Sequence, residues 1–376
     1  MKKVIICLAA ISFSLSAAAQ GETIPDGGHH ERIQSLWELA TKQEKKNDAF
    51  NLYLNFSGSF RETINPFTSA FQAKHLSLEI QGAFGKHLSY QFRHRLNRPW
   101  WTEGQEDNFA KATEIAMVGW KFNEHLAINM GKMRQIWGGF EFNENPLYIY
   151  QYSEFLENME FYGTGLMLSW HPAPSHELAV MVTNNFTSQP QYKGFEKSDH
   201  PFTYILNWNG RMFGGKFNTR WAAGAQTMAK GQYSFIATAG QQLALRRFQF
   251  YVDYMGEYDQ IDRLGIVSGE LGFNTGILYH TFVAKANWQF APQWNLMGKG
   301  MYEVASVHNN EFLMNYHLTI GWAASVEFFP WKGQDLRFFL NYVGRDLHYT
   351  QASGLAGKNG INHRVELGFI YRIKAY

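Results

Sequence analysis

Apolar and polar residues alternate along most of the chain. From Phe50 onward, apolar side chains recur at every second position, as in Leu52, Leu54 and Phe56. A β-strand points successive side chains to opposite faces, so each such segment predicts a strand with one apolar and one polar face. The predicted strands cover residues 50–61, 73–84, 87–97, 111–122, 125–134, 162–171, 176–184, 201–209, 215–226, 232–243, 246–258, 276–290, 293–306, 314–329, 335–346 and 361–374.

The connections between these sixteen segments alternate between short and long. An even-stranded antiparallel barrel in an outer membrane has this pattern, with short periplasmic turns and longer outer loops. Segment lengths are near the ~10 residues that a tilted membrane strand needs. Aromatic residues such as Trp120, Trp170 and Trp288 lie at strand ends, as in interfacial girdles. A soluble β-sandwich would also alternate, but these features favour an all-β transmembrane antiparallel β-barrel of about 16 strands, closed because lipid cannot satisfy an open edge.

The first residues indicate export. A basic start at Lys2 and Lys3 is followed by an apolar stretch and by Ser16-Ala17-Ala18-Ala19. This order predicts a secretory signal peptide over 1–19. The single cysteine, Cys7, lies within it, so we expect a mature chain without thiol chemistry.

A polar leader is expected over 20–49. Its residues Ile33, Leu36, Trp37 and Ala40 recur at helical spacing, which predicts one short amphipathic periplasmic helix. His29-His30 is interpreted as part of an exposed tail, because no further ligands stand nearby at a metal-site spacing. The barrel is then expected over 50–376.

Composition narrows the class further. Phe, Tyr and Trp make up 16% of the 376 residues, while charged residues make up 18%. So many aromatic residues exclude a disordered chain, and no apolar run after residue 20 is long enough for a spanning helix. The formal charge of +2 falls to zero once Lys2 and Lys3 are removed, so no nucleic-acid partner is expected.

Two stretches carry a family resemblance. KHLSLEIQGAFGKHLSYQFRHRLNR at 74–98 and MVGWKFNEHLAINMGKMRQIWGGF at 117–140 resemble hairpins of the porin O and P family of outer-membrane proteins. The resemblance is clear over about 74–170. It implies a sixteen-stranded porin, often trimeric, with a preference for phosphate in some members. Tyr376 departs from the pattern, because it is out of phase with the outward residues Phe369 and Tyr371.

The inward side chains give the candidate site, since a barrel of about 16 strands encloses an aqueous channel. Alternation puts Arg93 and Arg95 on the inner face, with Arg98 just above. The longest predicted loop, 135–161, carries five glutamates. We expect it to fold into the channel and its acids to face Arg93 and Arg95, although an acidic surface loop is the alternative. The predicted constriction residues are Arg93, Arg95, Arg98, Lys132, Arg134, Glu141 and Glu144.

The function predicted is passive diffusion of small hydrophilic solutes or ions across the outer membrane, with an anion or phosphate preference as one option. The five loop glutamates weigh against strong phosphate selectivity. The expected partners are outer-membrane lipid, the solutes, and two further copies in a homotrimer. No catalytic residue, metal or cofactor is predicted.

Two alternatives stay open. A barrel enzyme of the lipase or protease type is suggested by His94 and His280, which fall in the outward phase near the loops, but no G-x-S-x-G, H-E-x-x-H or phosphate-loop motif accompanies them. A plugged uptake channel for hydrophobic solutes would need a larger N-terminal plug than 20–49 provides.

Overall fold

The computed structural model describes residues 33–45, 47–99, 107–185, 192–272, 274–308, 316–350 and 358–376. The predicted signal peptide with Cys7, and the pair His29-His30, lie outside the described residues. No helix in the described part of the chain is long and apolar enough to span a membrane.

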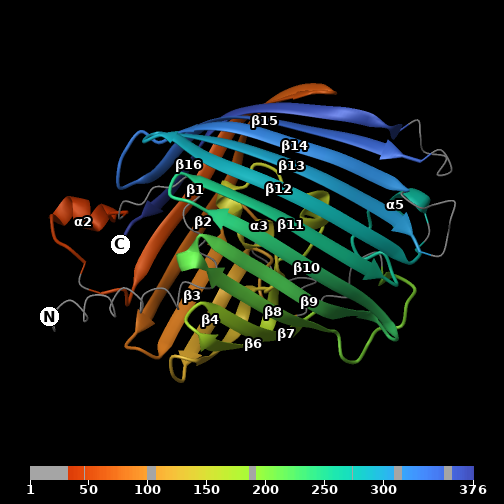
Figure 1. The fold of residues 1–376 in the computed structure, drawn as a ribbon, viewed down its shortest axis with the longest axis horizontal. Coiled ribbons are helices and arrows are strands. Elements are labelled where there is room, and N and C mark those ends of the chain that lie inside the picture. Colours follow the sequence, from red (N-terminus) through yellow and green to blue (C-terminus); the bar gives the residue numbers. More distant parts are fainter. Residues whose placement is uncertain are drawn as a thin grey trace.

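Sixteen antiparallel strands form one closed barrel (Figure 1). Each strand pairs with its neighbours in the chain, and the first strand pairs with the last, so that Tyr53 lies opposite Lys374 and Thr63 opposite Arg364. The predicted fold class and strand number are confirmed. The strands are β1 (Asn51–Ile64), β2 (Phe67–Phe84), β3 (Leu88–Arg95), β4 (Thr113–Lys121), β5 (Leu126–Arg134), β6 (Tyr162–Ala173), β7 (His176–Asn184), β8 (Phe202–Met212), β9 (Phe217–Ala229), β10 (Gln232–Ala244), β11 (Phe248–Asp259), β12 (Ile277–Ala291), β13 (Trp294–Val307), β14 (His317–Phe328), β15 (Asp335–Tyr349) and β16 (Gly360–Lys374).

One predicted loop is wrong. The connection expected over 62–72 is almost entirely strand, because β1 and β2 pair up to Ile64 and Phe67 and leave only Asn65 and Pro66 as the turn. The physical reason is that 62–64 and 67–71 contain β-favouring Thr, Ile and Phe, and the long ladder with β1 orders them. The hairpin therefore extends well beyond the end of β3, which pairs with β2 only as far as Ser77.

The outer surface carries the aromatic belt that the sequence predicts. Large aromatic side chains are exposed around the short-turn end of the barrel, where an amphipathic ring fits the headgroup boundary. They are Phe84, Trp120, Phe122, Trp170, Trp288, Phe290, Trp294 and Trp331.

The short predicted helix is present at the same end. Helix α2 (Leu36–Thr41) begins after Ser35, whose side chain forms a reciprocal capping box with Glu38. The backbone N–H of Gln34 donates to the carbonyl of Gly333 in the β14–β15 turn. Tyr376 packs edge-on against Trp37, with ring centroids 5.4 Å apart. Tyr376, which is out of phase with the outward residues of β16, therefore directs its ring toward Trp37 of the N-terminal segment and not toward the outer surface.

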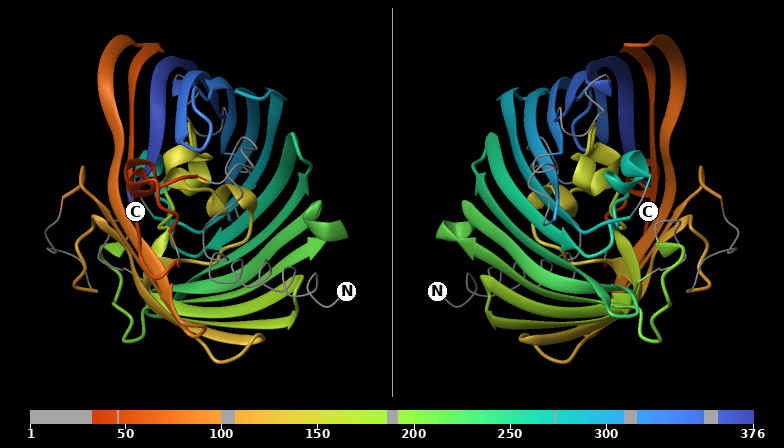
Figure 2. Two further views of the ribbon diagram at one scale, coloured as in Figure 1. Left: turned by 90° about the vertical axis from the view of Figure 1, so that its left-hand side faces the viewer. Right: turned by 90° about the vertical axis from the view of Figure 1, so that its right-hand side faces the viewer.

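Two long loops fold inside the barrel. The first is the inner loop, residues 135–161, which contains α3 (Phe140–Asn143), the 3-10 turn η1 (Pro146–Tyr148) and α4 (Glu154–Glu157). Figure 2 shows its yellow helical turns within the ring of strands. The second loop follows β11; its residues 260–272 contain α5 (Ser268–Leu271) and bury Leu264 and Val267 in the same apolar cluster as Trp137 and Phe155. One side of the lumen is thus a packed core and the other side stays open.

Candidate channel and constriction

The inner loop packs against two glycines of the barrel wall. Gly224 on β9 and Gly240 on β10 both belong to the inward phase of their strands. A Cβ added at Gly224 would lie 2.8 Å from the Trp137 ring, and one added at Gly240 would lie 2.8 Å from the Cα of Gly139. The absence of side chains at these two points lets the loop approach the wall closely.

Two buried carboxylates on the barrel wall bind the first backbone N–H groups of α3 and of α4. The Asp253 carboxylate accepts hydrogen bonds from the backbone N–H groups of Phe140 (2.8 Å) and Glu141 (2.7 Å). Glu303 accepts from the N–H groups of Glu154 (2.8 Å) and Phe155 (3.0 Å). These N–H groups have no partner within the helix, so the carboxylates satisfy donors that would otherwise be orphaned in the lumen.

The loop's own acids bind the wall as well, but not the wall that the sequence suggested. Glu144 pairs with Lys285 (2.9 Å), Glu154 with His317 (2.8 Å) and Glu157 with Arg345 (2.7 Å). Glu141 pairs with Lys299, and both groups are buried. The expectation that Glu141 and Glu144 face Arg93 and Arg95 is therefore wrong. Its physical reason is that the apolar side chains of the loop pack against β6–β13 and carry the glutamates to lysines on β12 and β13.

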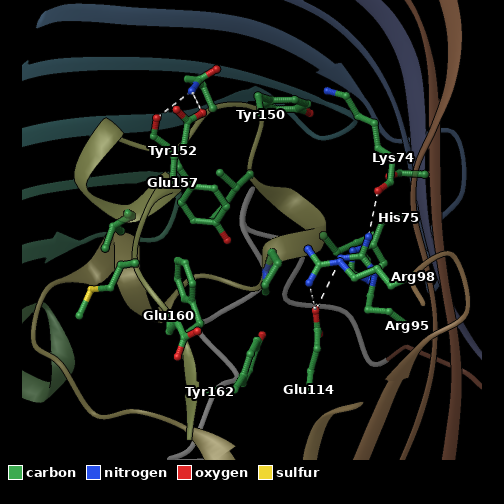
Figure 3. Close-up of a pocket in the computed structure, with 18 of the residues that line it drawn as sticks. Lys74, His75, Arg95, Arg98, Glu114, Tyr150, Tyr152, Glu157, Glu160 and Tyr162 are labelled. Atoms are coloured by element: carbon green, nitrogen blue, oxygen red, sulfur yellow. Dashed lines mark hydrogen bonds and ion pairs between the residues drawn. The ribbon is translucent and has the colours of Figure 1, made fainter. Parts of the chain in front are cut away.

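An open cavity of about 970 Å³ remains between the inner loop and the strands near the β1–β16 closure (Figure 3). Seven lysine and arginine side chains and three glutamates line it. The seven cations, here called the basic wall, are Arg61, Lys74, Arg95, Arg98, Lys111, Lys132 and Arg364. The three glutamates are Glu114, Glu157 and Glu160, the last two on the loop side in Figure 3.

The basic wall is organised around two buried carboxylates. Glu366 on β16 lies 2.8 Å from Arg61, 2.9 Å from Arg364 and in contact with Lys74. Three cations therefore share one carboxylate, and the cluster keeps excess positive charge next to the open space.

A second cluster repeats this arrangement. Glu114 on β4 lies 2.9 Å from Arg93, 3.6 Å from Arg95 and 3.8 Å from Arg98. Arg93 also donates to the Tyr162 hydroxyl at 2.5 Å and is almost fully buried, so it sits behind the surface that Arg95 and Arg98 form.

Lys132 and Arg134, the two basic residues just before the inner loop, make different contacts. Lys132 lines the cavity and pairs with Asp107 at 3.1 Å. Arg134 does not line it: its guanidinium donates to the backbone carbonyls of Phe142, Asn143 and Glu144, at 3.2, 2.9 and 2.9 Å. Arg134 thus fastens the end of α3 instead of facing solute.

Burial and hydrogen bonding compete at Glu154. Burial alone would raise its pKa, but the imidazole of His317, the hydroxyl of Thr319 and the nearby Arg345 outweigh burial and hold the pKa below its usual range. Glu154 is therefore ionised at neutral pH, as the contact with His317 requires.

The two outward histidines have neighbours unlike those of a catalytic relay. His94 lies 3.0 Å from the Thr113 hydroxyl, and His280 lies 2.9 Å from the Tyr254 hydroxyl. Within the described residues, no group of three or more His, Cys, Asp or Glu side chains could hold a metal ion.

Sequence reasoning missed several members of the basic wall. Lys74 shares the outward phase of Leu76 and Leu78 in the predicted strand 73–84, and only a register shift between β1 and β2 turns it inward. Arg61 is the last residue of the predicted strand 50–61 and was not selected. Glu114 and Glu366 fall in or beside alternating segments, but nothing in a single strand shows that each will gather three cations from neighbouring strands. The register of β1 with β16, which places Arg61 opposite Glu366, carries that information.

The comparisons with known proteins agree with this architecture. The outer membrane channel DcaP of Acinetobacter baumannii superimposes with a TM-score of 0.63 at 10% identity, covering 88% of this chain and 99% of that one. An anion-selective porin from Comamonas acidovorans gives 0.56 at 9% identity, covering 86% and 99%. OmpT of Vibrio cholerae in a trimer form gives 0.56 at 9% identity, covering 87% and 100%. No curated protein matches the sequence.

A closed sixteen-stranded barrel with a charged, open passage beside an infolded loop is the architecture of an outer-membrane porin, a channel for passive diffusion. The sequence pattern then specifies the group. Residues 50–373 match the model of the phosphate-selective porin O and P family, and the chain belongs to that family. Its place is the outer membrane.

Proposed function

We propose that this porin prefers anions, inorganic phosphate among them. The observation that carries the proposal is the basic wall, in which Glu366 contacts three of the seven cations and Glu114 contacts two more, together with Arg93 behind them. A ring of basic residues at a narrow point favours anion passage, because charge is poorly screened there. The family description and the anion-selective structural neighbour support the same direction.

The fate of the loop acids strengthens this proposal. Glu141, Glu144 and Glu157 are paired with Lys299, Lys285 and Arg345. Their charge is largely cancelled before it reaches the passage. The argument from five loop glutamates against phosphate therefore loses most of its force, and the basic wall sets the sign of the local field.

The test is ion selectivity in planar bilayers. We expect the zero-current potential in a KCl gradient to show anion preference, and the double variant Arg95→Gln/Arg98→Gln to shift it toward cations. A matched control is Lys193→Gln/Lys197→Gln, which removes two cations from an exposed loop that does not line the cavity. The control should leave the potential within error of the wild type.

An equal shift in both double variants would show that overall charge, and not the basic wall, sets selectivity. A wild-type channel that prefers cations would overturn the proposal directly.

We infer further that the porin acts as a homotrimer and that the mature chain consists of the leader 20–49 and the barrel 50–376, with the signal peptide 1–19 removed. Barrels that bury wall area against one another usually adopt closed rotational symmetry, and OmpT of Vibrio cholerae is described in a trimer form. Sizing in mild detergent tests the assembly, and a monomer as the only species would contradict it.

A role as an enzyme is not favoured by any specific arrangement in the described residues, since His94 and His280 contact Thr113 and Tyr254. An uptake channel for wholly apolar solutes is disfavoured by the seven cations along the passage. We therefore propose diffusion as the function of the barrel, without a catalytic step.

A further inference from the structure

The passage has two faces of different chemistry. Lys74, Arg95 and Arg98 lie on one side of the cavity in Figure 3, and the inner loop lies opposite. The loop side presents apolar surface, including Ile149, Tyr152 and Phe161. Apolar surface along the passage does not help to bind small inorganic ions, because these ions stay hydrated and do not remove that surface from water.

Three rings on the loop side form a connected group. Tyr152 and Phe161 have centroids 5.3 Å apart, and Phe161 and Tyr162 have centroids 6.3 Å apart. All three rings line the cavity and are only half-buried. We call Tyr152, Phe161 and Tyr162 the aromatic strip.

The aromatic strip is held in place from behind. Phe161 stacks on Phe142 with centroids 4.8 Å apart, and the Arg93 and Arg134 guanidinium groups lie 5.5 and 5.9 Å from the centre of the Tyr162 ring. These contacts order the rings before any solute arrives, so binding costs little reorganisation. Tyr150 differs, because it is buried and its hydroxyl donates to Glu327 at 2.5 Å.

Resting on the proposed anion preference, we infer that the passage selects organic anions with a flat apolar body, such as aryl phosphates and aromatic carboxylates. The basic wall binds the charged group, and the aromatic strip covers the ring of the solute. Burying a ring against aromatic surface adds a hydrophobic contribution and a preferred stacking geometry. A small solute with the same anionic group but no ring has only the electrostatic attraction to the basic wall.

The probes are phenyl phosphate and methyl phosphate, which carry the same charged group on different bodies. Each is titrated against the chloride current of the wild-type channel in planar bilayers. Phenyl phosphate should block half of the current at a concentration roughly tenfold lower than methyl phosphate, since only its ring buries apolar area.

Tyr152→Ser should reduce this concentration ratio several-fold. Tyr152→Leu keeps an apolar contact with Phe161 and should reduce it less, with wild-type chloride conductance showing that the inner loop is intact. The matched control is Phe213→Ser, which removes an aromatic ring that is 80% exposed at the short-turn end of the barrel. The control should leave the ratio unchanged.

A wild-type ratio near one, with anion preference intact, would overturn this inference and leave the proposed function standing. A cation-preferring channel would overturn both. An unchanged ratio in a conducting Tyr152→Ser channel would show that the ring of the solute binds elsewhere and would refute the role of the aromatic strip.

Discussion

Glu366 illustrates how single residues shape the channel. It is fully buried, yet three cations from β1, β2 and β16 contact it, so one carboxylate organises a positive surface without neutralising it. Glu114 does the same for Arg93, Arg95 and Arg98. Alternation along one strand places Arg93, Arg95 and Glu366 inside the barrel, whereas Lys74 and Glu114 are turned inward at register shifts between β1 and β2 and between β3 and β4. Alternation does not tell which side chains of neighbouring strands meet, because that depends on register across the sheet.

Glu141 should matter for stability and not for selectivity. In Glu141→Gln, buried Lys299 loses its carboxylate, and breaking a buried ion pair of this kind typically costs about 3–5 kcal/mol. We expect earlier urea unfolding of the folded barrel in detergent, with an unchanged zero-current potential. Glu124→Gln, at an exposed site, is the control and should change neither quantity. A clear shift toward anions in Glu141→Gln would mean that this glutamate faces the passage.

Glu154 gives the inner loop a defined pH dependence. The pKa of Glu154 lies below its usual range, so the contact between ionised Glu154 and His317 stabilises the loop at neutral and mildly acidic pH. This stabilisation is lost as the pH falls through the lowered pKa and the carboxylate becomes protonated. The part of the single-channel current noise that depends on the Glu154 contact should therefore rise in strongly acidic solution.

Glu154→Gln should show increased noise already at neutral pH and little further change on acidification, whereas Glu196→Gln on an exposed loop should behave as the wild type. Equal acid sensitivity in Glu154→Gln and the wild type would place the responsible group elsewhere.

At the scale of elements, the inner loop is the part that sequence reasoning could only half predict. Its length and position indicate that it enters the lumen, and the strand pattern predicts the wall around it. The side on which it rests depends on Gly224 and Gly240, on Asp253 and Glu303, and on an apolar surface assembled from many strands. The second loop, whose residues 260–272 are described, was not predicted to contribute to the core inside the barrel. Its buried Leu264 and Val267 belong to a short mixed segment, IDRLGIV at 261–267, that has no clear strand or helix period.

A larger residue at Gly224 should dislodge the inner loop. In Gly224→Val the new Cβ would lie 2.2 Å from the Tyr204 carbonyl oxygen on β8 and 2.8 Å from the Trp137 ring, and overpacking of this kind costs about 1–3 kcal/mol. We expect a larger and noisier single-channel conductance, because the loop no longer lies flat on β9. Gly300→Val is the matched control, since it adds the same side chain to β13 at a glycine with open space around it. Wild-type conductance in a folded Gly224→Val channel would contradict this docking.

At the scale of the whole molecule, the barrel is the part that the sequence predicts best. Period-two alternation, strand length and the succession of turns and loops yield sixteen strands, and the aromatic belt lies at the short-turn end. The barrel is predictable because lipid imposes the same requirement on every strand, which must pair with both neighbours and expose an apolar face. The extended β1–β2 hairpin escaped prediction because it rises past its neighbour β3, beyond the common strand length.

The orientation of the barrel can be tested with surface tags. A tag inserted after Lys197, in a long loop, should be accessible on intact cells, and a tag inserted between Gly214 and Gly215, in a short turn, should not be. Permeabilised cells should expose both tags, which controls for expression. The reverse accessibility on intact cells would contradict the assigned orientation.

The central claim is that excess positive charge along the basic wall makes this porin an anion channel. The most direct measurement is the zero-current potential of the wild-type channel across a tenfold KCl gradient, at low and at high mean salt. A potential of the sign set by chloride, which decreases toward zero as the mean salt rises, is the predicted result, because added salt screens the fixed charge. A potential of the sign set by potassium would contradict the account.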